Sequence, residues 1–243
     1  MYHSIGRPEA GDRMGLKVAS DTFAEHVMWL RHQGWKIVTV GELIRFPKKG
    51  HKQVAISFDD GYDDQLAAAR HLNEQGLRGT FFLITGKPGL AIGGKDYYRN
   101  WKLMDRTHWQ ELADQGHEIG GHSHQHPGPL TLQPSDCVAK DIDDCRSSLQ
   151  AGGPSGKPGF SYPHGAWSPA IGRAVETAGF DYACGSRPGS LAGRLERFYL
   201  PRIEISGRDS MEDFQQKVEG RGEIWRVLRH DLMRAVWRMQ GRV

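Results

Sequence analysis

The sequence predicts an α/β fold, because short apolar runs alternate with amphipathic helical patterns along most of the chain. A helix, a glycine and a strand follow one another in that order at Gly34, Gly76, Gly116 and Gly179. Such repeats place parallel strands inside and helices outside. The candidate site residues follow the expected strands, as they do in a (β/α) barrel. The repeats alone do not separate a barrel from an open sheet.

The expected elements can be given in order. The first helix carries an inner stripe of Phe23, Val27 and Leu30 and is closed by Gly34. The expected helices span residues 20–34, 41–46, 63–75, 107–115, 134–149, 168–178, 209–218 and 223–239. The expected strands are apolar runs over residues 35–40, 54–59, 78–84, 117–121, 160–163, 180–184 and 198–205. The longest irregular stretch lies between the third of these strands and the helix at 107.

Length and charge bound the classes of function. With 243 residues the chain suits one α/β domain over residues 1–222, followed by a C-terminal helix over 223–243. Lysine and arginine number 32 against 29 acidic residues, a balance of +3, so nucleic acid is not an expected partner. No transmembrane run and no signal peptide are expected, and three scattered cysteines suggest a reducing compartment. A cytoplasmic location is therefore expected.

Two adjacent carboxylates follow the expected strand at 54–59. Asp59 and Asp60 repel each other unless a cation lies nearby, and then one can bind the cation while the other serves as a base. Gly61 lets the chain turn sharply away from the strand end. An acidic turn that caps the next helix is the alternative interpretation of this segment.

Three histidines lie within five residues directly after the expected strand at 117–121. His122 and His126 have i, i+4 spacing, which on a helical turn places both rings on one face. With Asp60 they would make an Asp-His-His metal site with open coordination positions, typical of a catalytic metal. His124 is expected to face solvent or to support the ligands. A surface histidine cluster is the alternative.

These motifs resemble the NodB-homology polysaccharide deacetylases of carbohydrate esterase family 4. The resemblance rests on Ser57-Phe58-Asp59-Asp60-Gly61, on His122-Ser123-x-x-His126, and on Phe160-Ser161-Tyr162-Pro163-His164-Gly165 in that order. It implies a distorted (β/α) barrel of about seven parallel strands. It also implies removal of N-acetyl groups from an acetylated amino-sugar oligo- or polysaccharide, with release of acetate.

The resemblance implies a role for each motif residue. Asp60, His122 and His126 would hold a divalent ion, zinc by ligand type, with cobalt or nickel as other possibilities. Asp59 would be the base, and the backbone N–H of His164 would help to hold the oxyanion. Tyr62, Tyr162, Pro163 and Trp101 are assigned to substrate binding. For the aromatic residues of the 86–105 stretch, including Tyr97 and Tyr98, packing within the loop is the alternative.

The chain departs from the family pattern in two places. The family's third motif begins with an arginine that orients the aspartate, and here Ser161 stands in that place; Arg202 could supply the guanidinium from a later strand. No Leu-x-His follows Arg202, although the family takes its catalytic acid from that motif. One branch of the family opens instead on a Tyr-His segment, which makes His3 the candidate acid and His164 the next one.

The helix at 223–239 is amphipathic and basic. Its apolar stripe contains Ile224, Trp225, Leu228, Leu232, Ala235 and Met239. Such a helix can lie on a membrane surface. Packing on its own domain or on a partner is favoured, because no second anchoring signal is visible.

Other functions compete with deacetylation of an amino sugar. An O-acetyl carbohydrate esterase would use the same site with less need of an acid. Hydrolysis of a small non-peptide amide would need the same groups. A sugar-binding protein without metal or activity is the alternative from a different class.

Overall fold

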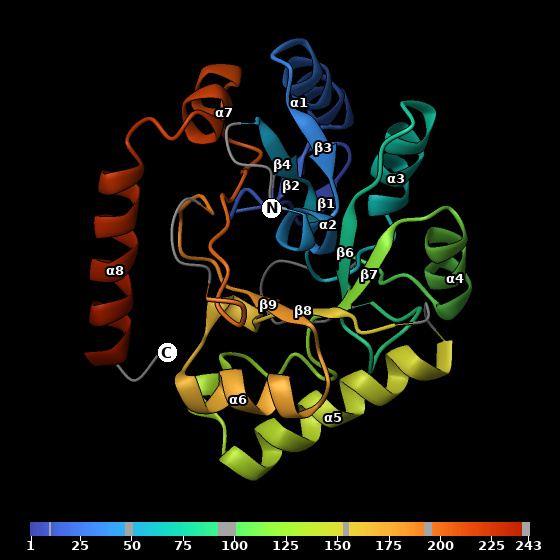
Figure 1. Ribbon diagram of the computed structural model, residues 1–243, viewed down its shortest axis with the longest axis vertical. Helices are drawn as coiled ribbons and strands as arrows, with labels where there is room; N and C mark the ends of the chain where they lie inside the picture. Colours follow the sequence, from blue (N-terminus) through green and yellow to red (C-terminus); the bar gives the residue numbers. More distant parts are fainter. Residues whose placement is uncertain (10, 47–50, 92–100, 153–155, 192–195, 240–243) are drawn as a thin grey trace.

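The computed structural model describes residues 1–9, 11–46, 51–91, 101–152, 156–191 and 196–239. Its centre is a curled sheet of five parallel strands that lie side by side in chain order. The strands are β5 (Ser57–Phe58), β6 (Thr80–Leu83), β7 (Glu118–Gly121), β8 (Gly159–Ser161) and β9 (Tyr182–Cys184). The connecting helices are α3 (Gln65–Glu74), α4 (Arg106–Asp114), α5 (Ser135–Gly152) and α6 (Pro169–Thr177). Figure 1 shows these helices outside the sheet, with α5 and α6 below β8 and β9.

Left-handed glycines turn the helices into the strands that follow. Gly76, Gly116 and Gly179 have φ values of 68°, 82° and 88°, which side chains other than glycine rarely adopt. Each follows the C-cap of its helix and reverses the chain toward the sheet. The predicted order of helix, glycine and strand, and the α/β fold with parallel strands, are therefore confirmed.

Each strand of the main sheet gives an apolar residue to one core. These residues are Phe58, Phe81, Ile119, Phe160 and Ala183, none more than 2% exposed. Leu72 of α3, Leu112 of α4, Ile142 of α5 and Val175 of α6 belong to the same buried cluster. Burial of this interface between the sheet and its helices is the main stabilising contribution to the fold.

The run expected as one strand over residues 54–59 divides at Ile56. Its first part, β4 (Gln53–Ala55), pairs in parallel with β3 (Lys36–Val38), whereas β5 pairs with β6. At the division, the carbonyl of Ile56 accepts a hydrogen bond from the Thr80 N–H at 2.9 Å. The chain thus changes partner at one residue and brings Asp59 to the edge of the main sheet.

Two segments too short to be regular strands close the curled sheet. Leu200 forms a parallel bridge with Cys184 at the end of β9, and the Met1 amino group donates to the carbonyl of Ile203 at 2.8 Å. The Tyr2 N–H donates to the carbonyl of Ser57 in β5, at 2.8 Å.

The prediction of a regular strand over 198–205 is wrong, because Pro201 has no N–H to donate to a ladder. Within the described residues the main sheet has five regular strands, where about seven were expected.

The remaining elements flank this closed sheet. They are β1 (Ser4–Ile5), β2 (Lys17–Val18), α1 (Ser20–His32), α2 (Val40–Arg45), two short 3₁₀ turns η1 (Leu130–Leu132) and η2 (Pro163–Gly165), α7 (Met211–Val218) and α8 (Glu223–Met239). Helix α8 runs along the outer edge of the molecule, drawn in red at the left of Figure 1. In the described part of the chain, no helix combines the length and hydropathy needed to cross a bilayer.

Candidate active site

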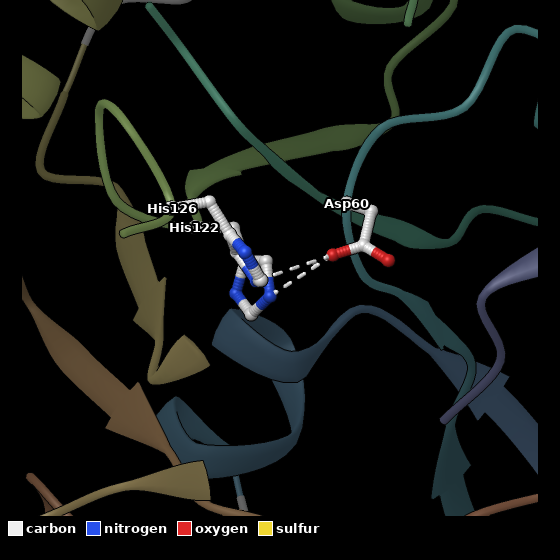
Figure 2. Close-up of side chains that lie close together, drawn as sticks. All are labelled: Asp60, His122 and His126. Carbon is white, nitrogen blue, oxygen red and sulfur yellow. Dashed lines mark ion pairs between the residues drawn. The ribbon is translucent and has the colours of Figure 1, made fainter. Parts of the chain in front are cut away.

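Polar side chains from three strands of the main sheet meet at its carboxyl edge. Asp59 and Asp60 follow β5, His122 follows β7, and Ser161 is the last residue of β8. Asp59, Asp60 and His122 are at most 7% exposed. Figure 2 shows Asp60 pointing across the end of the sheet toward His122 and His126. The strand ends therefore bring together residues that are up to about a hundred positions apart, as parallel strands do.

Asp60, His122 and His126 make a group that could hold a metal ion. Asp60 Oδ1 lies 3.2 Å from His122 Nε2 and 3.7 Å from His126 Nε2. One candidate ligand atom from each residue lies within 4.8 Å of the other two. One carboxylate and two imidazoles suit zinc, and three protein ligands leave room for further ligands. Among the described residues, no other group of three such side chains meets this spacing.

The hydrogen bond of His122 to Ser161 favours the ring tautomer that a metal ligand needs. Its Nδ1 lies 2.9 Å from the carbonyl oxygen of Ser161, which can only accept. When His122 is neutral, Nδ1 therefore carries the hydrogen and Nε2 presents a lone pair toward Asp60. Burial lowers the pKa of His122, but the charge of Asp59 and the hydrogen bond with Asp60 outweigh it and raise that pKa. Binding of a cation requires the neutral form of this ring.

The other two groups already have the charge state of metal ligands. Burial lowers the pKa of His126 to about 3, so this ring is neutral at ordinary pH. Burial would raise the pKa of Asp60, but the hydrogen bond and the charge of His122 hold it far below its ordinary value. A neutral imidazole beside an ionised carboxylate is the protonation state that a divalent cation requires.

Unusual backbone conformations gather at this site. The described non-glycine residues with positive φ are Asp60 (72°), Ser123 (70°), His126 (51°) and His164 (56°). Each costs of order 1–3 kcal/mol and persists only where the surrounding structure requires it. All four lie at the carboxyl edge of the sheet, and rings of His126 and His164 have centroids 5.0 Å apart. Strain of this kind marks the edge as a functional region.

A buried aspartate on α5 sets the shape of the histidine loop. Asp141 accepts hydrogen bonds from Ser123 Oγ at 2.5 Å, from the His124 N–H at 3.0 Å and from the Gln125 N–H at 2.8 Å. Ser123 Oγ accepts from the His126 N–H at 3.0 Å.

The prediction that a helical turn presents His122 and His126 is wrong, because this network holds the loop in left-handed conformations instead. His124 is half-buried and its Nδ1 lies 3.0 Å from Thr85 Oγ1.

Sequence patterns within one element do not indicate the role of Asp141, because its partners lie 16, 17 and 18 positions away. A signal was nevertheless present. Val138, Ile142 and Cys145 form the buried stripe of α5, and Asp141 lies on the same side of the helix with only 8% of its surface exposed. An acidic residue on a buried helical stripe requires hydrogen-bond partners, so its position indicates a structural or functional role.

Arg202 reaches Asp59 from the segment beyond β9. Arg202 Nη1 and Nη2 each lie 2.7 Å from one carboxylate oxygen of Asp59, and Nε donates to the carbonyl of Gly185 at 2.9 Å. Ser161 Oγ accepts from Arg202 Nη2 at 2.7 Å and donates to Asp59 Oδ2 at 3.0 Å. Burial raises the pKa of Asp59, but the Arg202 guanidinium and the His122 ring outweigh it and lower the pKa to about 2. Asp59 is therefore ionised and fixed in orientation.

His3 lies beside the aspartate pair. The backbone carbonyls of His3 and Asp59 both accept from Gln65 Nε2, each at 2.6 Å, and the N–H of Asp59 donates to the carbonyl of Tyr2 at 3.0 Å. The ring is half-buried, and its Nδ1 has no hydrogen-bond partner among the described residues. The backbone hydrogen bonds place His3 beside the aspartates, and the described part of the fold makes no hydrogen bond to its Nδ1.

His164 occupies the turn after β8. Its ring is exposed, and Arg234 of α8 donates to its carbonyl at 3.3 Å. In this turn the N–H groups of Tyr162, Gly165 and Ala166 donate to carbonyls of the fold, and Pro163 has none. The His164 N–H has no partner within the described residues. Partial desolvation on the side of the ring that faces the protein, together with the charge of His122, lowers the pKa of the His164 ring.

The residues assigned to substrate binding are buried. Tyr62 (4% exposed) packs edge-on against Trp101 (6% exposed), with ring centroids 5.1 Å apart. Trp101 Nε1 donates to Glu9 Oε2 at 3.2 Å, and Tyr162 Oη donates to the carbonyl of Phe198 at 2.8 Å. Pro163 is also buried. None of these rings offers an open face to a sugar in this structure, and their role in binding stays a prediction. Tyr97 and Tyr98 lie outside the described residues.

Comparison with known proteins identifies the family of this chain. The family model described as polysaccharide deacetylase matches residues 47–183, more than half of the chain. The Bacillus subtilis protein YxkH is 26% identical over 224 residues, which cover 90% of this chain and 75% of that protein. A poly-β-1,6-N-acetyl-D-glucosamine N-deacetylase of Staphylococcus aureus is 22% identical over 216 residues, which cover 84% of this chain and 72% of that enzyme.

A solved structure shows the same fold. The Streptococcus pyogenes deacetylase PplD, solved with acetate, superposes with a TM-score of 0.73 at 21% identity, and the match covers 90% of this chain and 96% of that one. The matched family segment contains Asp59, Asp60, His122, His126 and the 160–165 motif. The chain belongs to the polysaccharide deacetylase family and is a hydrolase of carbon–nitrogen bonds other than peptide bonds.

Proposed function

We propose that the protein is a metal-dependent hydrolase that removes N-acetyl groups from N-acetylhexosamine units of an oligo- or polysaccharide and releases acetate. One observation carries this proposal. The ionised Asp59, clamped by Arg202, directly precedes Asp60, which converges with His122 and His126 on one point. A base beside a three-ligand cation site is the arrangement that hydrolysis of an unactivated amide needs.

The three ligands fit a divalent ion, with zinc as the first choice and cobalt or nickel as alternatives. The carboxylate is ionised, one imidazole is neutral, and the other has its Nδ1 committed to the Ser161 carbonyl. A bound ion would polarise the acetyl carbonyl and make a water molecule more acidic.

Different residues of the chain then carry out the separate proton transfers. Asp59 accepts the proton of the attacking water, in an orientation fixed by Arg202 and Ser161. The His164 N–H, which no carbonyl of the described fold occupies, is available to the developing oxyanion. His3, on the Tyr2 side of the aspartates, protonates the leaving nitrogen as the C–N bond breaks. The products are acetate and a free amino sugar.

The curated relative from Staphylococcus aureus supports an amino-sugar polymer as the first substrate to test. An ester of the same acetyl group would need the same residues apart from the acid. The experiment must therefore compare linkages as well as test activity.

The test is acetate release from β-1,6-linked and β-1,4-linked N-acetylglucosamine oligomers, from acetylated xylan and from acetamide. Each substrate is incubated with the protein as purified, after chelator treatment, and after zinc is restored. We expect release from the amino-sugar oligomers, its loss with chelator and its recovery with zinc. Preference for xylan would assign an esterase, preference for acetamide an amidase of small molecules, and no release from any substrate a sugar-binding protein.

The matched variants are Asp59→Asn, which should abolish release, and Asp21→Asn, which changes an exposed aspartate on α1 and should not. Equal activity in both variants would contradict the role of Asp59.

A further inference from the structure

The apolar stripe of α8 faces away from the domain. Its residues Ile224, Trp225, Leu228 and Leu232, and Met233 beside them, have exposed fractions of 74%, 76%, 54%, 65% and 42%. They make up five of the ten large apolar side chains that are exposed in the described part of the protein, and they lie within ten residues of one helix. In Figure 1 the outer side of α8 faces no other element. The expected amphipathic helix is present, but its apolar stripe does not pack on the domain.

Polar side chains on the opposite side of α8 attach it to the domain. Asp231 accepts two hydrogen bonds from Arg187, at 3.2 and 3.0 Å, and Glu223 accepts from the Ser190 N–H at 3.3 Å. Arg234, only 8% exposed, donates to the carbonyl of His164. An amphipathic surface helix normally turns its apolar side inward. Here the inward side is polar, so the apolar side remains for another surface.

The size and shape of this stripe argue against a protein as its occupant. From Ile224 to Met233 the stripe is about 14 Å long at 1.5 Å per residue, and it is one helix wide. A convex ridge of that size offers a few hundred Å² at most, whereas stable protein partners each bury about 800 Å². A lipid surface needs no complementary groove, because a helix can sink its apolar side between the headgroups.

The charges of α8 favour an anionic surface. Its two acidic residues, Glu223 and Asp231, are both engaged by the domain. Arg226 and Arg229 flank the stripe, and Arg229 is exposed. Trp225, the most exposed of the five apolar residues, is of a type that prefers the membrane interface. The helix therefore combines an apolar face with basic side chains, and both favour binding to an anionic lipid surface.

We propose that α8 docks the protein on an anionic membrane surface, with the helix in the plane of the interface and the stripe facing the acyl chains. The contact between Arg234 and His164 would then hold the candidate active site beside the lipid headgroups. If the proposed function holds, the enzyme would act on glycans held near the membrane. This last step rests on the proposed function.

The test is flotation of the full-length protein with vesicles of phosphatidylglycerol and phosphatidylcholine, and with vesicles of phosphatidylcholine alone. We expect binding to the anionic vesicles, weaker binding at high salt and little binding to phosphatidylcholine alone. The double substitution Leu228→Gln and Leu232→Gln should weaken binding by about tenfold or more, because it removes two apolar side chains that would enter the lipid. The control Leu132→Gln alters a residue exposed to 45% in the turn η1 and should bind like wild type.

Three results would overturn the proposal. They are absence of wild-type binding to anionic vesicles, equal loss in the Leu132 control, and a wild-type dimer in sedimentation that the double variant converts to monomer. The last would assign the stripe to a second copy of the chain. Circular dichroism and acetate release from a soluble oligomer show whether the double variant is folded. Asp59→Asn should still bind vesicles, so failure of the proposed function and failure of docking give different results.

Discussion

Arg202 holds Asp59 by both carboxylate oxygens, with Nη1 and Nη2 each 2.7 Å from one oxygen. The two residues are 143 positions apart in the sequence. Asp59 follows β5, which is hydrogen-bonded to Tyr2, whereas Arg202 lies in the segment 200–205, which is hydrogen-bonded to Met1. Ser161 completes the clamp from β8. The guanidinium that the family's third motif usually supplies is thus provided from another part of the chain.

The first prediction concerns this clamp. Lysine cannot form two parallel hydrogen bonds with a carboxylate, so Arg202→Lys should let the Asp59 carboxylate rotate and should lower kcat by about 10²-fold. The metal affinity should change little, because Arg202 contacts no ligand side chain. The control Arg197→Lys alters an exposed arginine paired with Asp181 and should leave kcat unchanged. A kcat unaffected by Arg202→Lys would show that the clamp does not position the base.

The second prediction concerns Asp141, whose carboxylate accepts three hydrogen bonds from the histidine loop. Asp141→Asn replaces one accepting oxygen by an NH₂ group, which cannot accept from the loop. Zinc affinity should fall by about 10–100-fold, the range for residues that orient metal ligands. It is measured by competition with a chromophoric chelator, which needs no substrate. Asp143→Asn, an exposed aspartate on the same helix, should keep wild-type affinity, and a loss shared by both variants would contradict the assignment.

The third prediction concerns His26, which is fully buried. Its ring stacks on Phe214 with centroids 3.8 Å apart, its Nδ1 lies 3.1 Å from Tyr2 Oη, and Asp209 and Lys217 are the nearby charged groups. Burial lowers the pKa of His26 from 6.5 to about 4. Between these values the unfolded chain binds the proton and the folded chain does not, so the free energy of unfolding falls as the pH drops.

The loss from this group should reach about 3 kcal/mol when the pH falls from above 6.5 to below 4, at about 1.36 kcal/mol per pKa unit. His26→Gln keeps a hydrogen-bond partner for Tyr2 and cannot titrate, so its stability should depend less steeply on pH. Urea unfolding at pH 7.0, 6.0 and 5.0 measures the slope. Equal slopes in wild type and variant would contradict the assignment.

The fourth prediction concerns His3 as the acid. His3→Ala should lower turnover of an N-acetyl substrate by about 10²–10⁴-fold, the range for a general acid. An activated acetyl ester should be affected much less, because its leaving group needs no proton. The measurement is the ratio of amide to ester turnover in wild type, in His3→Ala and in the exposed control His32→Ala. If the ratio stays the same in His3→Ala, the ring only packs or positions, and His164 becomes the next residue to test.

The sequence predicts most of what strand ends determine. Asp59, Asp60, His122 and Ser161 lie where the apolar runs end, so their convergence follows from parallel strands. The conformation of the histidine loop could not be predicted, because it depends on Asp141, which belongs to another element. The i, i+4 spacing of His122 and His126 selected the pair that lies beside Asp60, but for a helical geometry that the loop does not adopt.

Long-range pairing explains the other differences. Residues 198–205 have the composition of a strand. Because Pro201 has no N–H, the segment forms only a bridge and a few hydrogen bonds, two of them with Met1. The stripe of α8 is visible in the sequence, whereas the side of the helix that faces the domain is decided by partners such as Arg187 and His164. Periodicity identifies the faces of a helix but not what each face contacts.

In the proposed function, one aspartate holds the metal and its neighbour moves the proton. The most direct test measures bound zinc and acetate release in Asp59→Asn and Asp60→Asn, side by side. Asp59→Asn should retain zinc and lose turnover, because it removes a base and not a ligand. Asp60→Asn should lose zinc affinity and turnover together. Equal zinc loss in the two variants, or full acetate release by zinc-free protein, would contradict the account.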